Sequence, residues 1–330
     1  MTLLRLSPAA LSRSRFALSP LAETMGSMLV LSKSCSDPWL TAWHARHCGA
    51  LSAALHADPF AKGLVGLLGS TKWIPEFIAI PPADGMHTRL ADELAALARA
   101  SDEEVRAGLE KSVAHSWKQH DLSWLSGHGW SARIADLLQS VWRVHVVPDW
   151  PRRRAVLERD VMYRAGLLAA YGWPRALQQM TRRSAWVGAD AIRFTSHQGP
   201  DRIVGEEGML FVPISASTGS WLCAAPPAGY ALVYPARGTA PATQRTRHED
   251  ALARLIGTGR AAILQELEHP ATSSELAAQL GQSLGTIGGH LAVLRDAELI
   301  VGTRVGRRVV YRRTRAGDLL AARCPDGAED

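Results

Sequence analysis

The chain has 330 residues, 47% of them hydrophobic and 21% charged, a composition typical of a soluble globular protein with room for two domains. Its formal net charge of +6 fits a polyanionic partner, although arginine on a solvated surface is the commoner cause of such an excess. No apolar run approaches the ~20 residues that a membrane-spanning helix requires. This argues against a membrane protein.

The four cysteines form no CxxC pair, so we expect reduced thiols rather than a disulfide framework; they are Cys35, Cys48, Cys223 and Cys324. The first twenty residues are rich in Arg and Ser and lack acidic residues, as transit peptides do, but the arginine bias runs through the whole chain. Without a clear export signal, the sequence predicts a cytoplasmic protein.

Helical spacing of apolar residues dominates the first half of the chain. The pattern predicts helices over Leu21–Leu31 and Trp39–Leu55, from a capping box at Ser101 and Glu104 through about His115, over Trp130–Val147, and over Pro151–Met180 with an interruption at Pro174.

The period then changes to that of short strands separated by Gly, Pro and Asp. The expected strands are Ala191–Thr195, Met209–Pro213 and Ala231–Tyr234. Long helices followed by a few strands predict an α+β domain.

A domain boundary is indicated by a change of composition. All eleven tryptophans lie at or before Trp221, and the segment Tyr234–Thr246 is rich in Pro, Gly and Thr. We therefore expect a mainly helical N-terminal regulatory or dimerisation domain over residues 1–240, a linker over 241–247, a winged helix over 248–320 and a disordered tail over 321–330.

The C-terminal segment predicts a helix-turn-helix followed by a β-hairpin. An amphipathic helix is expected over Glu249–Leu267, and a Thr272/Glu275 capping box opens a second helix through Leu280. Gly281 supplies the turn, and Ser283 caps a third helix. Two β-rich segments then follow, Leu299–Arg304 and Arg307–Arg313, joined by Val305–Gly306.

A helix-turn-helix reads DNA with the N-terminal residues of its second helix, which lies in the major groove. Here the candidates are Gln282, Ser283, Leu284, Thr286, Gly289 and His290. A helical hairpin that binds no nucleic acid is the alternative.

The hairpin carries six arginines and no acidic residue between Leu299 and Ala316. We expect Arg304, Arg307 and Arg308 to contact phosphates or a minor groove. Arg312, Arg313 and Arg315 are open between DNA contact and a structural role. The alternative for the whole hairpin is a solvated edge that its charges protect from aggregation.

Four local motifs together resemble the winged helix of the ArsR family of bacterial repressors over about seventy residues. They are the R-x-x-I-L helix, the S-S-E-L-A helix, the H-L-x-x-L-R-x-A-x-L-I stretch and the G-R-R-V-x-Y wing. Upstream, WIPEFIAIPP, MLFVPISAS and YALVYPA are similar to segments in the long N-terminal extension of an actinobacterial subgroup. The resemblance implies a homodimeric, sequence-specific regulator of double-stranded DNA, usually a repressor that a small-molecule effector relieves.

The chain departs from the family pattern in two places. Gly288 and Gly289 stand where the family usually has Ser and a polar or basic residue, and each glycine costs a helix interior roughly 1 kcal/mol. Ala277 and Gln279 occupy the family's thiolate site, and no Asp-x-His pair follows the wing. The family's familiar metal sites are therefore absent.

Cys35, His44, His47 and Cys48 remain as ligand types, the last three on one helical face, but we favour ordinary helix residues and predict neither metal nor cofactor. The chain has no GxGxxG, P-loop, GxSxG or HExxH pattern, so no catalytic residue is predicted. Two further hypotheses stay open: a winged helix that contacts protein, and an enzyme domain fused to a DNA-targeting module.

Overall fold

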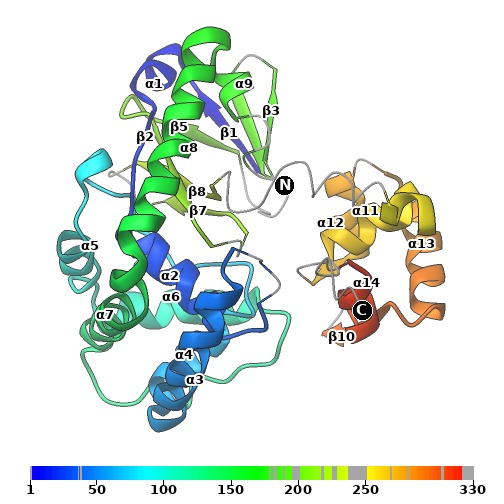
Figure 1. Ribbon diagram of the computed structural model, residues 1–330, viewed down its shortest axis with the longest axis horizontal. Coiled ribbons are helices and arrows are strands. Elements are labelled where there is room, and N and C mark those ends of the chain that lie inside the picture. Colours follow the sequence, from blue (N-terminus) through cyan, green and yellow to red (C-terminus); the bar gives the residue numbers. More distant parts are fainter. Residues whose placement is uncertain are drawn as a thin grey trace, which may run out of the picture. The chain divides into compact units, whose positions relative to one another are not determined.

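The computed structural model divides the chain into two compact units, Thr2–Thr239 and Ala240–Asp330 (Figure 1). It describes residues 2–35, 37, 39–177, 180, 184–188, 190–194, 201–216, 219–224, 229–236, 251–267, 270–280, 282–305 and 308–321. The predicted linker, 241–247, lies outside the described residues, as does all but the first residue of the predicted tail, 321–330.

The N-terminal unit begins with two short β–α steps and continues with a long helical stretch. Its opening elements are β1 (Thr2–Leu6), α1 (Pro8–Arg13), β2 (Arg15–Phe16) and α2 (Pro20–Leu31). Helices follow: α3 (Thr41–Ala57), α4 (Pro59–Leu68), α5 (Leu90–Leu97), α6 (Asp102–Ala114), α7 (Trp130–Val141), α8 (Trp150–Tyr171) and α9 (Trp173–Leu177).

The strands after these helices return to pair with the beginning of the chain. They are β3 (Ser184–Val187), β4 (Ala191–Phe194), β5 (Arg202–Val204), β6 (Met209–Ile214), β7 (Trp221–Ala224) and β8 (Tyr230–Pro235). One sheet has the order β3-β4-β1-β5, and the other has the order β2-β6-β8-β7. In the second sheet β2, β6 and β8 are parallel, which is why its central strands are apolar on both faces.

Helix α2 forms the centre of the helical core. All of its residues are buried, and it packs against α3, α4, α5, α7 and β6. Its apolar side chains Leu21, Met25 and Met28 join one continuous cluster with Trp43 and Ile134. A helix buried all round must satisfy its polar residues internally.

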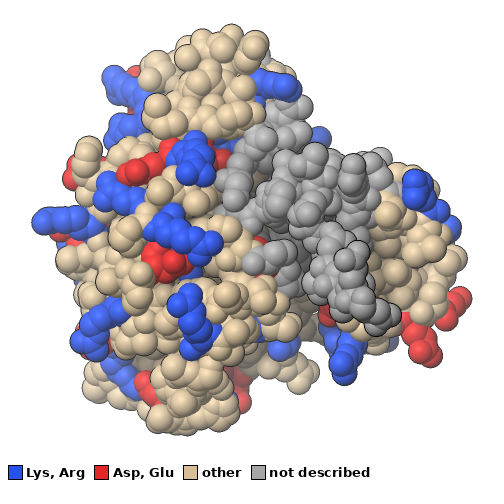
Figure 2. All heavy atoms as spheres, in the orientation of Figure 1, with Lys and Arg blue, Asp and Glu red and all other residues tan. Residues whose placement is uncertain are grey.

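On the face seen in Figure 2, basic and acidic side chains alternate over the N-terminal unit. On that face the positive charge of the unit is not gathered into one patch. The excess of arginine therefore says little about where on this unit a polyanion would bind.

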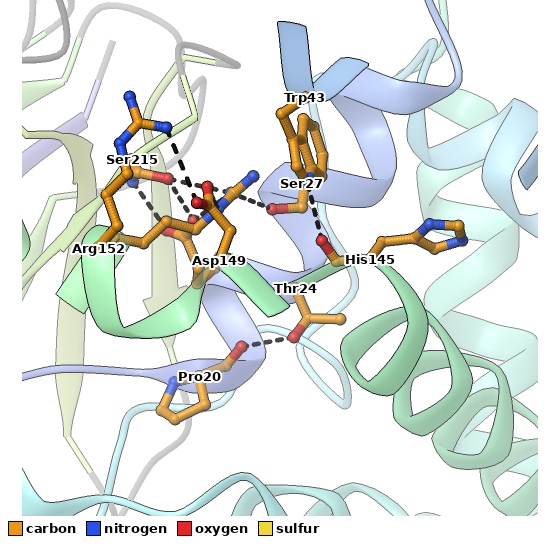
Figure 3. Close-up of polar contacts among 10 residues, drawn as sticks. Pro20, Thr24, Ser27, Trp43, His145, Asp149, Arg152 and Ser215 are labelled. Atoms are coloured by element: carbon orange, nitrogen blue, oxygen red, sulfur yellow. Dashed lines mark hydrogen bonds and ion pairs between the residues drawn. The ribbon is translucent and has the colours of Figure 1, made fainter. Parts of the chain in front are cut away.

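The polar residues of α2 belong to a buried network that Figure 3 shows in part. Glu23 pairs with Arg153 of α8, and the Arg153 guanidinium also donates to the hydroxyls of Ser27 and Ser215 at 2.9 and 3.1 Å. The backbone amide of Ser215, directly after β6, donates to the Glu23 carboxylate at 2.7 Å. This network joins α2, α8 and the end of β6.

The structure confirms the α+β class and most predicted helices, and it corrects one boundary. The predicted interruption of Pro151–Met180 at Pro174 is wrong, because the break falls at Gly172, whose φ of +78° only glycine adopts easily. Pro174 instead lies in the first turn of α9, where its missing N–H costs nothing.

The C-terminal unit follows the predicted order of helices and hairpin. Residues 251–256 are helical, followed by α11 (Thr258–Glu266), β9 (Ala271–Thr272), α12 (Ser273–Leu280), α13 (Leu284–Asp296), β10 (Ile300–Val305), β11 (Arg308–Arg313) and α14 (Arg315–Ala321). Strands β10, β11 and β9 form an antiparallel sheet in that order. Among the described helices of the whole chain, none has the length and apolar character needed to cross a membrane.

One prediction in this unit is wrong. The helix expected over Glu249–Leu267 is divided at Gly257, which has a φ of +85°. The apolar spacing on both sides of Gly257 continues, so periodicity alone gave no sign of the break.

Candidate nucleic-acid interface

The core of the C-terminal unit fixes the angle between α12 and α13. Leu264 of α11, Leu276 of α12, and Ile287 and Leu291 of α13 are all buried in one cluster with Ile300 of β10. Helix α13 therefore turns one face inward and leaves the opposite face exposed.

Both helix starts predicted from capping residues are confirmed. Thr272 and Glu275 form a reciprocal capping box before α12, with the Thr272 amide donating to the Glu275 carboxylate at 2.7 Å. Ser283 caps α13 by accepting a hydrogen bond from the Thr286 amide at 3.1 Å. The two caps hold the turn between the helices.

The first turn of α13 presents an exposed, mostly small surface. Ser283, Leu284, Thr286 and Gly289 are all exposed, and 57% of Leu284 is accessible. Gln282 is half-buried, and its amide oxygen is buried with no hydrogen-bond partner among the described residues.

His290 has a different environment from the other candidates on this helix. A Cβ atom built on Gly259 of α11 would lie 2.7 Å from its Nε2 atom. The imidazole thus fills the space that Gly259 leaves, and it packs between two helices of the unit. Its placement favours a packing role over a DNA contact.

Gly288 and Gly289 lie in the middle of α13, and a Cβ atom built on either would meet nothing within 4 Å. No close internal packing requires glycine here. What requires a small residue at these positions, if anything does, lies outside the described part of the chain.

The wing is formed by β10 and β11, whose register pairs Arg304 with Val309 and Val305 with Arg308. Since side chains alternate across a strand, Arg304 shares a face with buried Ile300, whereas Arg308 and Arg312 lie on the opposite face. Arg304 and Arg308 are both exposed. The wing therefore carries arginines on both faces near its tip; Arg307, in the turn, lies outside the described residues.

Arg313 has a structural role that the sequence left open. Its Nε and Nη2 atoms donate to the backbone carbonyls of Leu264 and Gln265 at 2.6 and 2.8 Å, at the carboxyl end of α11. An arginine at a helix C-terminus satisfies carbonyls that lack an intrahelical partner. Arg312 and Arg315 are exposed and stay candidates for phosphate contact.

The ligand-type residues of the N-terminal unit have internal hydrogen-bond partners. The His44 ring bonds the Lys33 carbonyl at 2.8 Å, and the Cys35 thiol donates to the Asp37 carbonyl at 3.8 Å. His47 bonds His145 through their Nδ1 atoms at 3.1 Å, and burial lowers the pKa of both imidazoles. No cluster of three or more His, Cys, Asp or Glu that could hold a metal occurs within the described ranges.

Comparison with known proteins identifies one part of the chain. Residues 260–303 match the family model of a helix-turn-helix domain, and the match extends from α11 into β10. No curated protein and no solved structure matches the chain. The C-terminal unit thus carries a winged helix-turn-helix domain of the kind found in DNA-binding regulators.

Proposed function

We propose that the protein is a sequence-specific transcription regulator that acts as a homodimeric, ligand-responsive repressor of the ArsR type. The carrying observation is the exposed first turn of α13, which the caps of α12 and α13 hold beside an arginine-bearing wing. In this arrangement α13 enters the major groove and the wing arginines approach phosphates.

The remaining features of the proposal follow from this mode of binding. Two winged helices related by a twofold axis would read half-sites about 10 bp apart, or a multiple of that spacing. The N-terminal unit would supply dimer contacts, effector sensing or both. The protein would act in the cytoplasm, and the proposal includes no catalytic activity.

Titration of duplex DNA from upstream of its own gene, over a range of salt concentrations, tests the proposal. A regulator should prefer one fragment over competitor DNA at every salt concentration, whereas sequence-independent binding gives a steep salt dependence with no preference. Absence of DNA binding at low salt contradicts the proposal.

The wing is tested separately by Arg308→Ala. Loss of one phosphate contact per protomer should lower the salt slope by about one for each contact and weaken binding to all sequences alike. Arg89→Ala is a matched control, because Arg89 is an exposed arginine of the other unit that pairs with Asp92.

A protein-contact role for the winged helix is the second candidate. It is favoured by the outward face of α13, where Gly285, Gly289 and Ala292 present no long polar side chain. Unchanged DNA binding after substitution of both Arg307 and Arg308 by Ala would favour this candidate over the first.

A further inference from the structure

We propose that Leu284 reads the 5-methyl group of thymine, so that each half-site of the operator carries a thymine where the first turn of α13 enters the major groove. The inference rests on the proposed DNA-binding function and names the chemistry of its sequence readout.

Leu284 is the largest exposed side chain at the start of α13. It occupies the first helical position after the Ser283 cap, and 57% of it is accessible. Residues at this end of a recognition helix are those that contact base edges. An exposed leucine there offers an apolar contact and no hydrogen bond.

The neighbouring hydroxyls are already engaged in the cap. Ser283 Oγ accepts from the Thr286 amide, and the two hydroxyl oxygens lie 2.9 Å apart in a hydrogen bond. One of the two hydroxyl hydrogens is used in that bond, so at most one remains to reach a base. The pair can add little hydrogen-bond readout while it caps the helix.

The other polar candidates are also restricted. Glutamine recognises adenine through its amide oxygen and nitrogen together, but the Gln282 oxygen is buried. His290 packs against Gly259, and no other charged or ionisable residue occurs between Gln282 and Arg295. Gly285, Gly288 and Gly289 contribute no side chain.

Direct readout by α13 is therefore mainly apolar. In the major groove of unmodified DNA, the apolar group that distinguishes one base pair from the others is the thymine methyl. The exposed glycines also allow the backbone of α13 to approach the groove closely. Leu284 is thus the specificity-determining side chain of this helix.

The test begins with selection of bound sites from a random duplex library by the full-length protein. Each thymine of the selected site is then replaced by deoxyuridine, which removes only the methyl group. At one position per half-site we expect a loss of about fourfold in affinity for each methyl. Other thymines should show no such loss.

Leu284→Ala should weaken binding to the thymine site and abolish the difference between thymine and deoxyuridine, whereas Leu284→Met should retain it. Leu255→Ala is the matched control, since Leu255 is an exposed leucine of the same unit outside α13. An equal response to deoxyuridine in the wild type and in Leu284→Ala overturns the inference. Failure to select any sequence would instead contradict the proposed function itself.

Discussion

Arg153 and Glu23 form an ion pair inside the N-terminal unit, with Nη1 2.7 Å from Oε1 and neither side chain exposed. Hydrogen bonds from Ser27 and Ser215 complete the network. A buried pair of this kind adds little net stability compared with apolar residues of the same size, but either partner left alone is costly.

Arg153→Met should therefore lower the free energy of unfolding by about 3–5 kcal/mol, because it leaves the Glu23 carboxylate buried without a counter-ion. Urea denaturation of the full chain, followed by tryptophan fluorescence, measures the loss. The adjacent residue provides the control: Arg154 forms an exposed ion pair with Glu158 at 2.7 Å. Arg154→Met should cost less than about 1 kcal/mol, and equal effects of the two substitutions would contradict the prediction.

Stability of the N-terminal unit should fall as pH rises toward neutrality because of Glu93. Burial raises the pKa of this carboxyl from 4.5 to about 7, even though it accepts hydrogen bonds from Ser19 and Leu21. The folded state then binds the proton more tightly than the unfolded state does. The stabilisation is complete below pH 4.5 and disappears as pH rises through about 7, a change of about 3 kcal/mol.

The variant Glu93→Gln should remove this pH dependence. Thermal unfolding of both proteins between pH 5 and 8 checks it. The lowered pKa of His47 and His145 acts in the opposite direction, lowering stability as pH falls below about 6.5, but it is common to both proteins. The difference curve thus isolates Glu93, and a flat difference would show the prediction to be wrong.

Three glycines of the C-terminal unit should respond oppositely to alanine. Gly288→Ala and Gly289→Ala should each stabilise α13 by about 1 kcal/mol, since the new methyl meets open space. Gly317→Ala should cost about 1–3 kcal/mol, because its Cβ would lie 2.0 Å from the Leu299 carbonyl oxygen. Hydrogen exchange of the α13 amides in the full chain reports both effects, and the same sign for all three would refute the argument.

Glu298, which follows α13, has a φ of +56° that non-glycine residues adopt at a cost. Its carbonyl accepts from the Thr314 hydroxyl at 2.6 Å, so the turn is held from both sides. Glu298→Asn should slow hydrogen exchange in the wing, since Asn tolerates this conformation, and Glu298→Val should accelerate it. The order Asn, Glu, Val in decreasing stability is the expected outcome; a reversed order would exclude backbone strain at this position.

The sequence predicted those parts of the fold that depend on local signals. The capping residues Ser101, Thr272 and Ser283 mark three helix starts, because a side-chain oxygen beside free backbone amides acts within a few residues. The strands β6 and β8 were visible as short apolar runs. The sequence also contained the motifs that carry the helix-turn-helix match.

The features that escaped prediction depend on distant partners. Strand β1 was missed because a strand of five residues has no pattern that distinguishes it without its partners in β4 and β5. The roles of Arg313 and His290 depend on α11, which is adjacent in space to both. The separation of Arg304 from Arg308 required the register of the wing.

The pairing of β1 with β4 and β5, and of β2 with β6, has a consequence for biosynthesis. The first strands leave the ribosome long before their partners, and at typical rates of translation the delay is roughly 10–40 s. During that interval the apolar side chains of Leu4, Leu6 and Phe16 have no sheet to join. The nascent N-terminal unit is thus a natural substrate for chaperones, whereas the winged helix, built from neighbouring segments, can fold as soon as it emerges.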